Sequence, residues 1–252
     1  MKVHFVGAGP GDPELVTVKA QRLLKNCRIC IYAGSLVSPQ VLGLLPEHAE
    51  KHDSASLDLE QITALFMDAK ARGIDVVRLH TGDPSIYGAV GEQMNELDKL
   101  GIAYDIVPGV SSFQAAAAAL KTELTAPEIA QTIILTRTSG RTPMPSEQDL
   151  DVLARTHSTL CIFLSAHGLK DVARTLATHY GEDCPAAVVY RASWPEERIV
   201  RGTLADIAEK VDEAGIRKTA MILVGRALTR NVAVSKLYDP AFSHEYRVGR
   251  QS

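Results

Sequence analysis

The sequence predicts an α/β protein of two lobes with a cleft between them, a mostly parallel sheet in the first lobe and a mixed sheet in the second. Three observations lead to this fold class. Short apolar runs alternate with helical patterns through the first half of the chain, which is typical of a parallel sheet covered on both faces. In the second half, two strand-like runs follow each other closely around residues 193–196, which indicates a hairpin. The length of 252 residues suits two lobes of roughly 100 to 130 residues each.

The first lobe is expected to begin with a strand over residues 3–6 that leads into a glycine-rich loop. After the loop, Asp12 is expected to cap a helix whose apolar stripe runs through Leu15, Val18 and Leu23. Alternating strands and helices are then expected at 28–34, 38–45, 57–73, 75–82, 87–101, 103–109 and 111–120.

The second lobe is expected to hold five strands and three helices. The strands are expected at 132–137, 159–166, 186–192, 197–203 and 219–225. The helices are expected at 147–156, 168–179 and 204–214. A hinge near residues 121–131 divides the halves, so the expected domains are 1–121, 122–230 and a tail, 231–252. The tail has little periodicity and is expected to be a surface arm or a partner-binding segment.

Composition and charge argue against several classes of protein. The formal net charge is −3 and the isoelectric point about 6.2, so no footprint for nucleic acid is present. The first residues pass directly into a strand pattern without the layout of a signal peptide, and no apolar run approaches membrane-spanning length. We therefore expect a cytoplasmic protein that binds neither nucleic acid nor a membrane.

The four cysteines include one C-x-x-C pair, Cys27 and Cys30. Residues three apart in a strand face opposite sides, so this pair is not expected to share a metal ion or a disulfide. No second C-x-x-C follows. We expect four buried, reduced, structural cysteines and no protein-bound metal.

The glycine-rich loop resembles a phosphate-binding turn but departs from it in chemistry. Three glycines lie within residues 7–11, yet the sixth position of a dinucleotide fingerprint is Asp12 rather than glycine. Pro10 removes a backbone N–H, and the second expected strand ends at residues 33–35 without the acid that would bind a ribose. The loop is therefore poorly suited to a phosphate.

Three loops of the first lobe follow expected strands and are rich in glycine, proline and small polar residues: 7–13, 80–88 and 107–112. Because ligands of parallel sheets bind at the carboxyl ends of strands, these loops predict a preformed cleft for a small ligand held largely by backbone groups. A sulfonium cation with an amino acid end and an adenosine would suit loops without a phosphate cradle. Asp83 has two interpretations, a helix cap or a ligand contact.

The chain resembles the tetrapyrrole methylases. The resemblance covers nearly the whole chain and rests on the segments VGAGPGDPELVTVKA, HTGDPSIYGA, VPGVSSFQAAAAAL, LTRTSGRTP, ASWPEERIVRGTLADIAEKV, IRKTAMILVG and LYDPAF. LTRTSGRTP and SWPEERIVRGTL narrow it to the precorrin-4 and cobalt-precorrin-4 C11-methyltransferases of cobalamin synthesis. The resemblance implies an S-adenosylmethionine-dependent C-methyltransferase that is a homodimer and binds the folded donor in the cleft between its lobes.

The resemblance also implies the donor contacts. In the first lobe these are Pro10, Asp83, Ile86, Ser111 and Ser112. In the second lobe they are Leu164, Ala192 and Ala220.

The tetrapyrrole substrate carries carboxylates, and arginines are the side chains that best bind them in pairs of hydrogen bonds. The expected substrate-binding residues are Arg137, Arg141 and Arg191, whereas Arg198 beside two glutamates fits a solvated surface charge. No catalytic base is expected, because methyl transfer from a sulfonium to an electron-rich carbon depends mainly on orientation and exclusion of water. His80 is expected to be a polar residue at a lobe boundary rather than a proton relay.

Two other functions stay open at this point. One is a tetrapyrrole methylase that acts on a different ring carbon or another acceptor. The other is a protein that binds S-adenosylmethionine or a tetrapyrrole without turnover. No residue indicates whether the ring contains cobalt.

Overall fold

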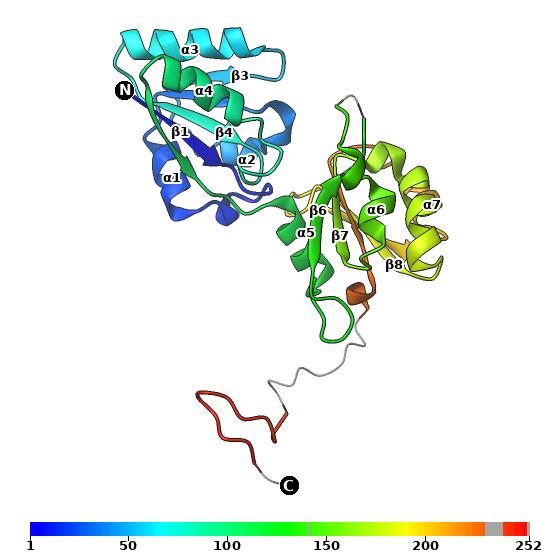
Figure 1. Ribbon diagram of the computed structural model, residues 1–252. Helices are drawn as coiled ribbons and strands as arrows, with labels where there is room; N and C mark the ends of the chain where they lie inside the picture. Colours follow the sequence, from blue (N-terminus) through cyan, green and yellow to red (C-terminus); the bar gives the residue numbers. More distant parts are fainter. Residues whose placement is uncertain (141, 230–238, 251–252) are drawn as a thin grey trace. The chain divides into compact units, whose positions relative to one another are not determined.

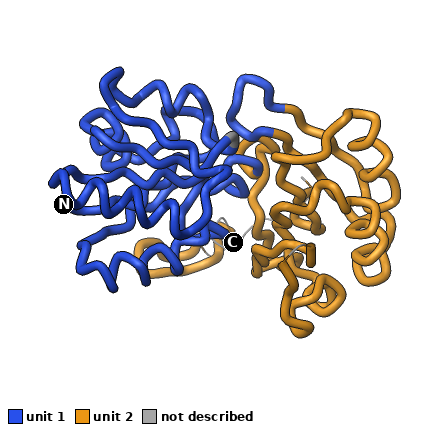
Figure 2. The backbone as a smooth tube through the Cα atoms, turned by 90° about the horizontal axis from the view of Figure 1, so that it is seen from above, with its two compact units in different colours: residues 1–116, 191–197 blue, residues 117–190, 198–252 orange. Residues whose placement is uncertain are grey.

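The computed structural model describes residues 1–140, 142–229 and 239–250. The chain divides into two compact units (Figure 2). The first unit comprises residues 1–116 and 191–197, and the second comprises 117–190 and 198–252. Segment 191–197 therefore groups with the first part of the chain by its contacts, although the strands on either side of it belong to the second unit.

The first unit is built around a five-stranded sheet in which all neighbouring strands run parallel (Figure 1). The strands are β1 (Lys2–Gly7), β2 (Ile29–Tyr32), β3 (Glu50–Asp53), β4 (Val76–His80) and β5 (Ala103–Val107). Their order across the sheet is β3-β2-β4-β1-β5. The parallel sheet predicted for the first lobe is confirmed.

Helices cover both faces of this sheet (Figure 1). They are α1 (Val18–Lys25), α2 (Pro39–Leu42), α3 (Leu59–Ala71) and α4 (Gly91–Lys99), with short 3₁₀ turns at Pro13–Leu15 and Gly34–Leu36. Helix α5 (Ser112–Leu120) follows β5, and its residues are divided between the two units. One face packs against α1 and α2 through Leu24 and Val41. The other packs against α3 and α4 through Phe66 and Leu97. Each face thus has its own apolar core, as alternating side chains of a strand require.

Two local expectations for the first lobe are wrong. Strand β3 was not expected, because its four residues are all polar and it lies at an edge where it pairs only with β2. The helix expected to start at Asp12 starts at Val18 instead. The Asp12 carboxylate accepts a hydrogen bond from the Glu14 amide at 2.8 Å and caps only a 3₁₀ turn, after which Thr17 caps α1. Val18, expected in the apolar stripe, is 85% exposed.

The second unit contains a mixed five-stranded sheet. Its strands are β6 (Ile133–Arg137), β7 (Thr159–Phe163), β8 (Pro185–Tyr190), β9 (Arg198–Thr203) and β10 (Ala220–Val224), in the order β6-β7-β10-β8-β9. Only β6 and β7 pair in parallel, and the other pairs are antiparallel. The mixed sheet and the β8–β9 hairpin are both as predicted.

The helices of the second unit pack on this sheet around one apolar core. They are α6 (Leu150–Ala154), α7 (Leu169–Tyr180) and α8 (Ile207–Glu213), with 3₁₀ turns at Ser146–Gln148, Ala166–Gly168 and Arg226–Leu228. Leu176 of α7 and Ile207 of α8 are fully buried against strand residues such as Ile162.

All four cysteines are buried free thiols, as expected. The expectation that Cys27 and Cys30 face opposite sides is wrong, because both lie in the same apolar core. Strand alternation begins only at Ile29, so Cys27 belongs to the turn before β2. A hydrogen bond between the two thiols lowers the pKa of Cys27 and, together with burial, raises the pKa of Cys30.

Among the described residues, none of the helices is both long enough and apolar enough to cross a membrane. The same residues contain no group of three or more histidine, cysteine, aspartate or glutamate side chains arranged to hold a metal ion.

Candidate functional site

Three loops meet at the carboxyl end of the first sheet. They follow β1, β4 and β5, and β1 pairs with both of the other strands. The loop after β1 is tied to β4 and its loop by backbone hydrogen bonds from Ala8 to His80 (2.7 Å) and between Gly9 and Gly82 (2.9 and 3.3 Å). The expectation that these loops lie together is therefore met by direct contacts within one unit.

Glycines make this close approach possible. A Cβ atom on Gly109 would lie 2.1 Å from the carbonyl oxygen of Gly82, and one on Gly7 would lie 2.6 Å from the Cα atom of Gly109. No residue with a Cβ atom fits at such distances. Gly7, Gly82 and Gly109 thus bring the three loops into backbone contact.

Asp83 links the second loop to the third. One carboxylate oxygen accepts a hydrogen bond from the Gly109 amide at 2.9 Å, and the other accepts from the amide (2.8 Å) and the hydroxyl of Ser85. Partial burial opposes ionisation of this carboxyl, but the hydrogen bonds from Ser85 and Gly109 together hold its pKa below the usual value. Asp83 is therefore a charged tie between loops, as well as the cap of the turn that follows it.

The remaining donor contacts expected in the first lobe lie in the same loops. The Ile86 amide donates to the Asp83 carbonyl at 3.2 Å. Ser111 is buried, its amide donates to the Gln114 side chain at 2.9 Å, and it precedes α5, which begins at Ser112. The Pro10 carbonyl accepts a hydrogen bond from the indole N–H of Trp194. Ala192, expected on the second lobe, lies in segment 191–197 of the first unit.

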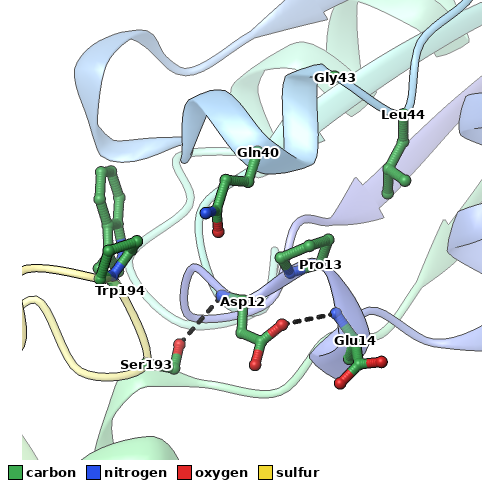
Figure 3. A pocket seen from close by; sticks show the side chains of 9 residues that line it. Asp12, Pro13, Glu14, Gln40, Gly43, Leu44, Ser193 and Trp194 are labelled. Carbon is green, nitrogen blue, oxygen red and sulfur yellow. Dashed lines mark hydrogen bonds between the residues drawn. The ribbon is translucent and has the colours of Figure 1, made fainter.

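The opening loop also borders a cavity of about 660 Å³ within the first unit (Figure 3). Its lining residues are Asp12, Pro13, Glu14, Gln40, Gly43, Leu44, Ser193, Trp194 and Pro195. Figure 3 shows the Ser193 hydroxyl beside the Asp12 amide, which donates to it at 3.1 Å.

His80 ends β4 beneath these loops. Burial, helped by the positive charge of Arg78, lowers its pKa to about 3, so the imidazole is neutral at physiological pH. Its Nε2 atom has no hydrogen-bond partner among the described residues. Arg78 is itself buried and donates to Gln93 at 2.8 Å.

Three of the remaining expected residues, Arg137, Leu164 and Ala220, lie at one end of the second sheet. Arg137 ends β6, where it pairs with Phe163 of β7. Leu164 follows β7 directly, and Ala220 begins β10, where it pairs with Tyr190. Because β10 runs antiparallel to β7 and β8, its start lies at the end where those strands finish.

Two residues at this end have a backbone conformation that is rare for L-amino acids. Leu164 has φ 55° and is 63% exposed, and Thr219 has φ 55°. Such conformations cost roughly 1–3 kcal/mol and cluster at functional sites. Leu164 is itself an expected donor contact and Thr219 precedes another, so the strain marks the same end of the sheet as the expected contacts.

The expected substrate arginines differ in their surroundings. The Arg137 guanidinium donates to the carbonyls of Thr138 (3.3 Å), Thr142 (2.9 Å) and Pro143 (3.1 Å), so it shapes its own loop. Arg191 lies over the Trp194 ring at 4.7 Å and pairs with Glu196 at 3.4 Å.

The sequence also indicated Arg141 as a substrate-binding residue and Arg198 as a surface charge. Arg141 lies outside the described residues. Arg198 lies over the ring of Tyr190 at 4.9 Å and donates to the Ala214 carbonyl at 2.8 Å.

Sequence reasoning did not identify Trp194 or Ser193 as partners of the opening loop. The only available signal was the position of a single tryptophan at the tip of an expected hairpin. Nothing in the sequence pairs that tip with a loop more than 180 residues earlier.

The family model of the tetrapyrrole (corrin/porphyrin) methylases matches residues 2–208. This chain belongs to the tetrapyrrole methylases. A relative in the family, the cobalt-precorrin-4 C(11)-methyltransferase of Methanocaldococcus jannaschii, is 53% identical over 248 residues, which cover 98% of this chain and 96% of the relative.

Solved structures agree with this membership. The X-ray structure of a cobalt precorrin-4 methyltransferase has a TM-score of 0.88 and 45% identity, covering 90% of this methylase and 96% of that chain. The uroporphyrin-III C-methyl transferase from Thermus thermophilus, solved in complex with S-adenyl homocysteine, has a TM-score of 0.76 and 33% identity over 90% of this chain and 93% of that one.

Proposed function

We propose that this methylase transfers the methyl group of S-adenosylmethionine to carbon C11 of precorrin-4 or cobalt-precorrin-4 in cobalamin biosynthesis. The observation that carries the proposal is the cluster of three glycine-rich loops at the carboxyl end of the first sheet. It occurs in a chain with 53% identity to a relative that is named for this reaction with the cobalt-containing ring.

The residues present fit a donor held by backbone groups rather than a phosphate. Three amides of the opening loop already donate to protein oxygens: Ala8 to His80, Gly9 to Gly82 and Asp12 to Ser193. Pro10 has no N–H to give, and Asp12 adds a negative charge. A phosphate would find few donors here, whereas the ammonium and hydroxyl groups of S-adenosylmethionine can donate to carbonyl oxygens.

Pro10, Asp83, Ile86, Ser111, Ser112 and Ala192 would hold the donor on the first unit, and Leu164 and Ala220 would hold it on the second. The donor supplies a methyl group made electrophilic by the sulfonium. The protein's share of the work is to orient both reactants and to exclude water. A neutral, buried His80 is consistent with chemistry that needs no strong base at this position.

Arg137, Arg141 and Arg191 would bind the peripheral carboxylates of the ring. The Arg137 guanidinium also donates to the carbonyls of Thr138, Thr142 and Pro143. We also propose that the enzyme is cytoplasmic and forms a homodimer. Light scattering of the purified protein gives its molar mass and so tests the homodimer.

Incubation with donor labelled with ¹³C in its methyl group tests the reaction. Precorrin-4 and cobalt-precorrin-4 are supplied in separate reactions, and the isolated product is read by carbon NMR. We expect the labelled methyl group on C11 of at least one of the two substrates. Label on another ring carbon would mean a different regiochemistry, and binding of both ligands without label transfer would mean a binding protein.

The same assay tests the arginines. Arg137→Ala should raise the tetrapyrrole KM about 10-fold and leave the donor KM unchanged, as expected for about 1.4 kcal/mol of lost binding. Arg155→Ala is the matched control, because Arg155 is an exposed arginine whose guanidinium pairs with Asp151 of α6. Equal KM values in all three proteins would remove Arg137 from substrate recognition.

A further inference from the structure

The tip of the opening loop is held from segment 191–197. Trp194, the only tryptophan of the chain, is 9% exposed, and its indole N–H donates to the Pro10 carbonyl at 2.8 Å. Two residues after Pro10, the amide of Asp12 donates a hydrogen bond to the Ser193 hydroxyl at 3.1 Å (Figure 3). Two neighbouring residues of one segment thus fix both ends of the three-residue tip 10–12.

The residue between these two bonds, Gly11, packs against the same tryptophan. A Cβ atom on Gly11 would lie 2.0 Å from Cδ1 and 2.2 Å from Nε1 of Trp194. The indole ring therefore occupies the space that any other side chain at position 11 would need. This contact explains the third glycine of the loop, which no phosphate requires.

Segment 191–197 is itself fixed in an unusual turn. Arg191 has φ 46° and Ser193 has φ 69°, both rare for residues other than glycine. The Trp194 amide donates to the Arg191 carbonyl at 2.9 Å, and the Ser193 amide donates to the Glu197 carboxylate at 2.7 Å. The Arg191 guanidinium lies 4.7 Å from the centre of the Trp194 ring. The indole is thus held in place by contacts within its own segment as well as by the loop.

The stem of the opening loop has other supports. Gly7 contacts Gly109, and Gly9 forms two hydrogen bonds with Gly82. Those contacts stop at residue 9. Within the described part of the chain, the side chains that form hydrogen bonds to the tip from a distant segment are those of Ser193 and Trp194. Loss of the indole should therefore change the tip and leave the remaining loop cluster in place.

We propose that Trp194, assisted by Ser193, is a positioning residue that sets the conformation of the tip 10–12 for binding of S-adenosylmethionine. The inference rests on the proposed function, because it concerns the donor loop of that site. It assigns Trp194 and Ser193, at the tip of the β8–β9 hairpin, a role in donor affinity. Trp194 acts through the Pro10 carbonyl and the Gly11 backbone.

Calorimetry with S-adenosylhomocysteine tests this role without turnover. Trp194→Phe keeps an aromatic ring but removes the N–H, so the buried Pro10 carbonyl loses its partner and the dissociation constant should rise about 5- to 20-fold. Ser193→Ala should raise it about 2- to 5-fold, because a neutral hydrogen bond at a less buried amide is lost. Tyr104→Phe is the matched control. Tyr104 lies on β5, and its hydroxyl donates a hydrogen bond to the Asp98 carboxylate at 3.3 Å. Loss of this hydroxyl should leave donor affinity unchanged.

Steady-state kinetics supply a readout that a purely structural role would not move. In Trp194→Phe the donor KM should rise by the same factor as the dissociation constant, while kcat and the tetrapyrrole KM stay within about twofold of the wild type. Equal rises in both KM values with a lower melting temperature would indicate general damage and would overturn the inference.

The remaining outcomes separate the two claims. Absence of S-adenosylhomocysteine binding to the wild-type protein would refute the proposed function itself. Binding to the wild type with unchanged affinity in Trp194→Phe and Ser193→Ala would refute the positioning role alone. If Trp194→Phe does not fold, Ser193→Ala decides: weaker donor binding supports the role and unchanged binding contradicts it.

Discussion

The ends of the two sheets differ in how their backbones make sharp turns and close contacts. In the first unit the close contacts are made by glycines, with Gly109 placed against Gly7 and Gly82. In the second unit the unusual turns are made by residues with side chains, Leu164 and Thr219. The first arrangement requires the absence of a Cβ atom, whereas the second tolerates a Cβ atom at an energetic cost. Glycine to alanine in the first region should therefore lower stability, whereas threonine to glycine in the second region should raise it.

The largest effect is expected for Gly109→Ala. The new Cβ atom would lie 2.1 Å from the Gly82 carbonyl oxygen, so the second and third loops must separate. We expect a loss of about 3 kcal/mol in the free energy of unfolding and a loss of about 100-fold or more in donor affinity. Denaturant melts and calorimetry with S-adenosylhomocysteine measure the two effects.

Gly91→Ala is the matched control in the same unit. Gly91 begins α4, and a Cβ atom there would meet nothing within 4 Å. Because alanine favours a helix over glycine, this variant should be as stable as the wild type or more stable by up to about 1 kcal/mol. Similar damage in both variants would mean that the close packing of the loops has no special role.

Asp83→Asn should produce the next largest effect. The amide keeps the shape of the carboxylate but loses the charge that accepts hydrogen bonds from Gly109 and Ser85. Donor affinity should fall by roughly 10- to 100-fold, which corresponds to about 1.4 to 2.8 kcal/mol. Ser85→Ala removes one of the donors to Asp83 and should have a smaller effect in the same direction. Unchanged affinity in Asp83→Asn would reduce Asp83 to a helix cap.

The sequence predicted the first region better than the second for a physical reason. Glycine, proline and an acid-proline pair are visible in a sequence, and the rule for parallel sheets places them at one edge. Positive φ at Leu164 and Thr219 carries no sequence signal, because neither residue type favours it. Strand β3 was missed because an exposed edge strand of polar residues has no apolar pattern, and the partners of the loop tip were missed because they lie far away in the chain.

The pH dependence of stability tests the neutral imidazole beneath the first region. The folded-state pKa of His80 is lowered to about 3 from an ordinary value of 6.5, first by burial and then by the charge of Arg78. Between these values the unfolded state binds a proton that the folded state does not, so stability contributed by His80 is complete above pH 6.5 and falls as the pH drops towards 3. The slope from one such group is at most about 1.4 kcal/mol per pH unit.

Denaturant melts of the wild type and His80→Gln over this pH range measure the difference in slope. The variant should be less stable at neutral pH but should lose stability more slowly as the pH falls. Parallel curves for the two proteins would show that His80 titrates alike in the folded and unfolded states.

The smallest effect is expected in the second region. Thr219→Gly replaces a β-branched residue at φ 55° with one that adopts this conformation freely. The relief of strain is partly offset by the greater entropy of glycine in the unfolded chain, so a gain of about 0.5 to 1 kcal/mol is expected from thermal or denaturant melts. A clear loss of stability would mean that the threonine side chain makes contacts that outweigh the strain.

Hydrogen exchange with and without ligand tests the central claim, that the glycine loops bind an adenosyl sulfonium donor without a phosphate cradle. Saturating S-adenosylhomocysteine should slow amide exchange in segments 8–12, 81–86, 109–113 and 191–197, and saturating NAD should leave these segments unchanged. Gly109→Ala should abolish the protection, and Gly91→Ala should retain it. Protection by NAD in the same loops, or protection by S-adenosylhomocysteine elsewhere in the chain but not in these loops, would contradict the account.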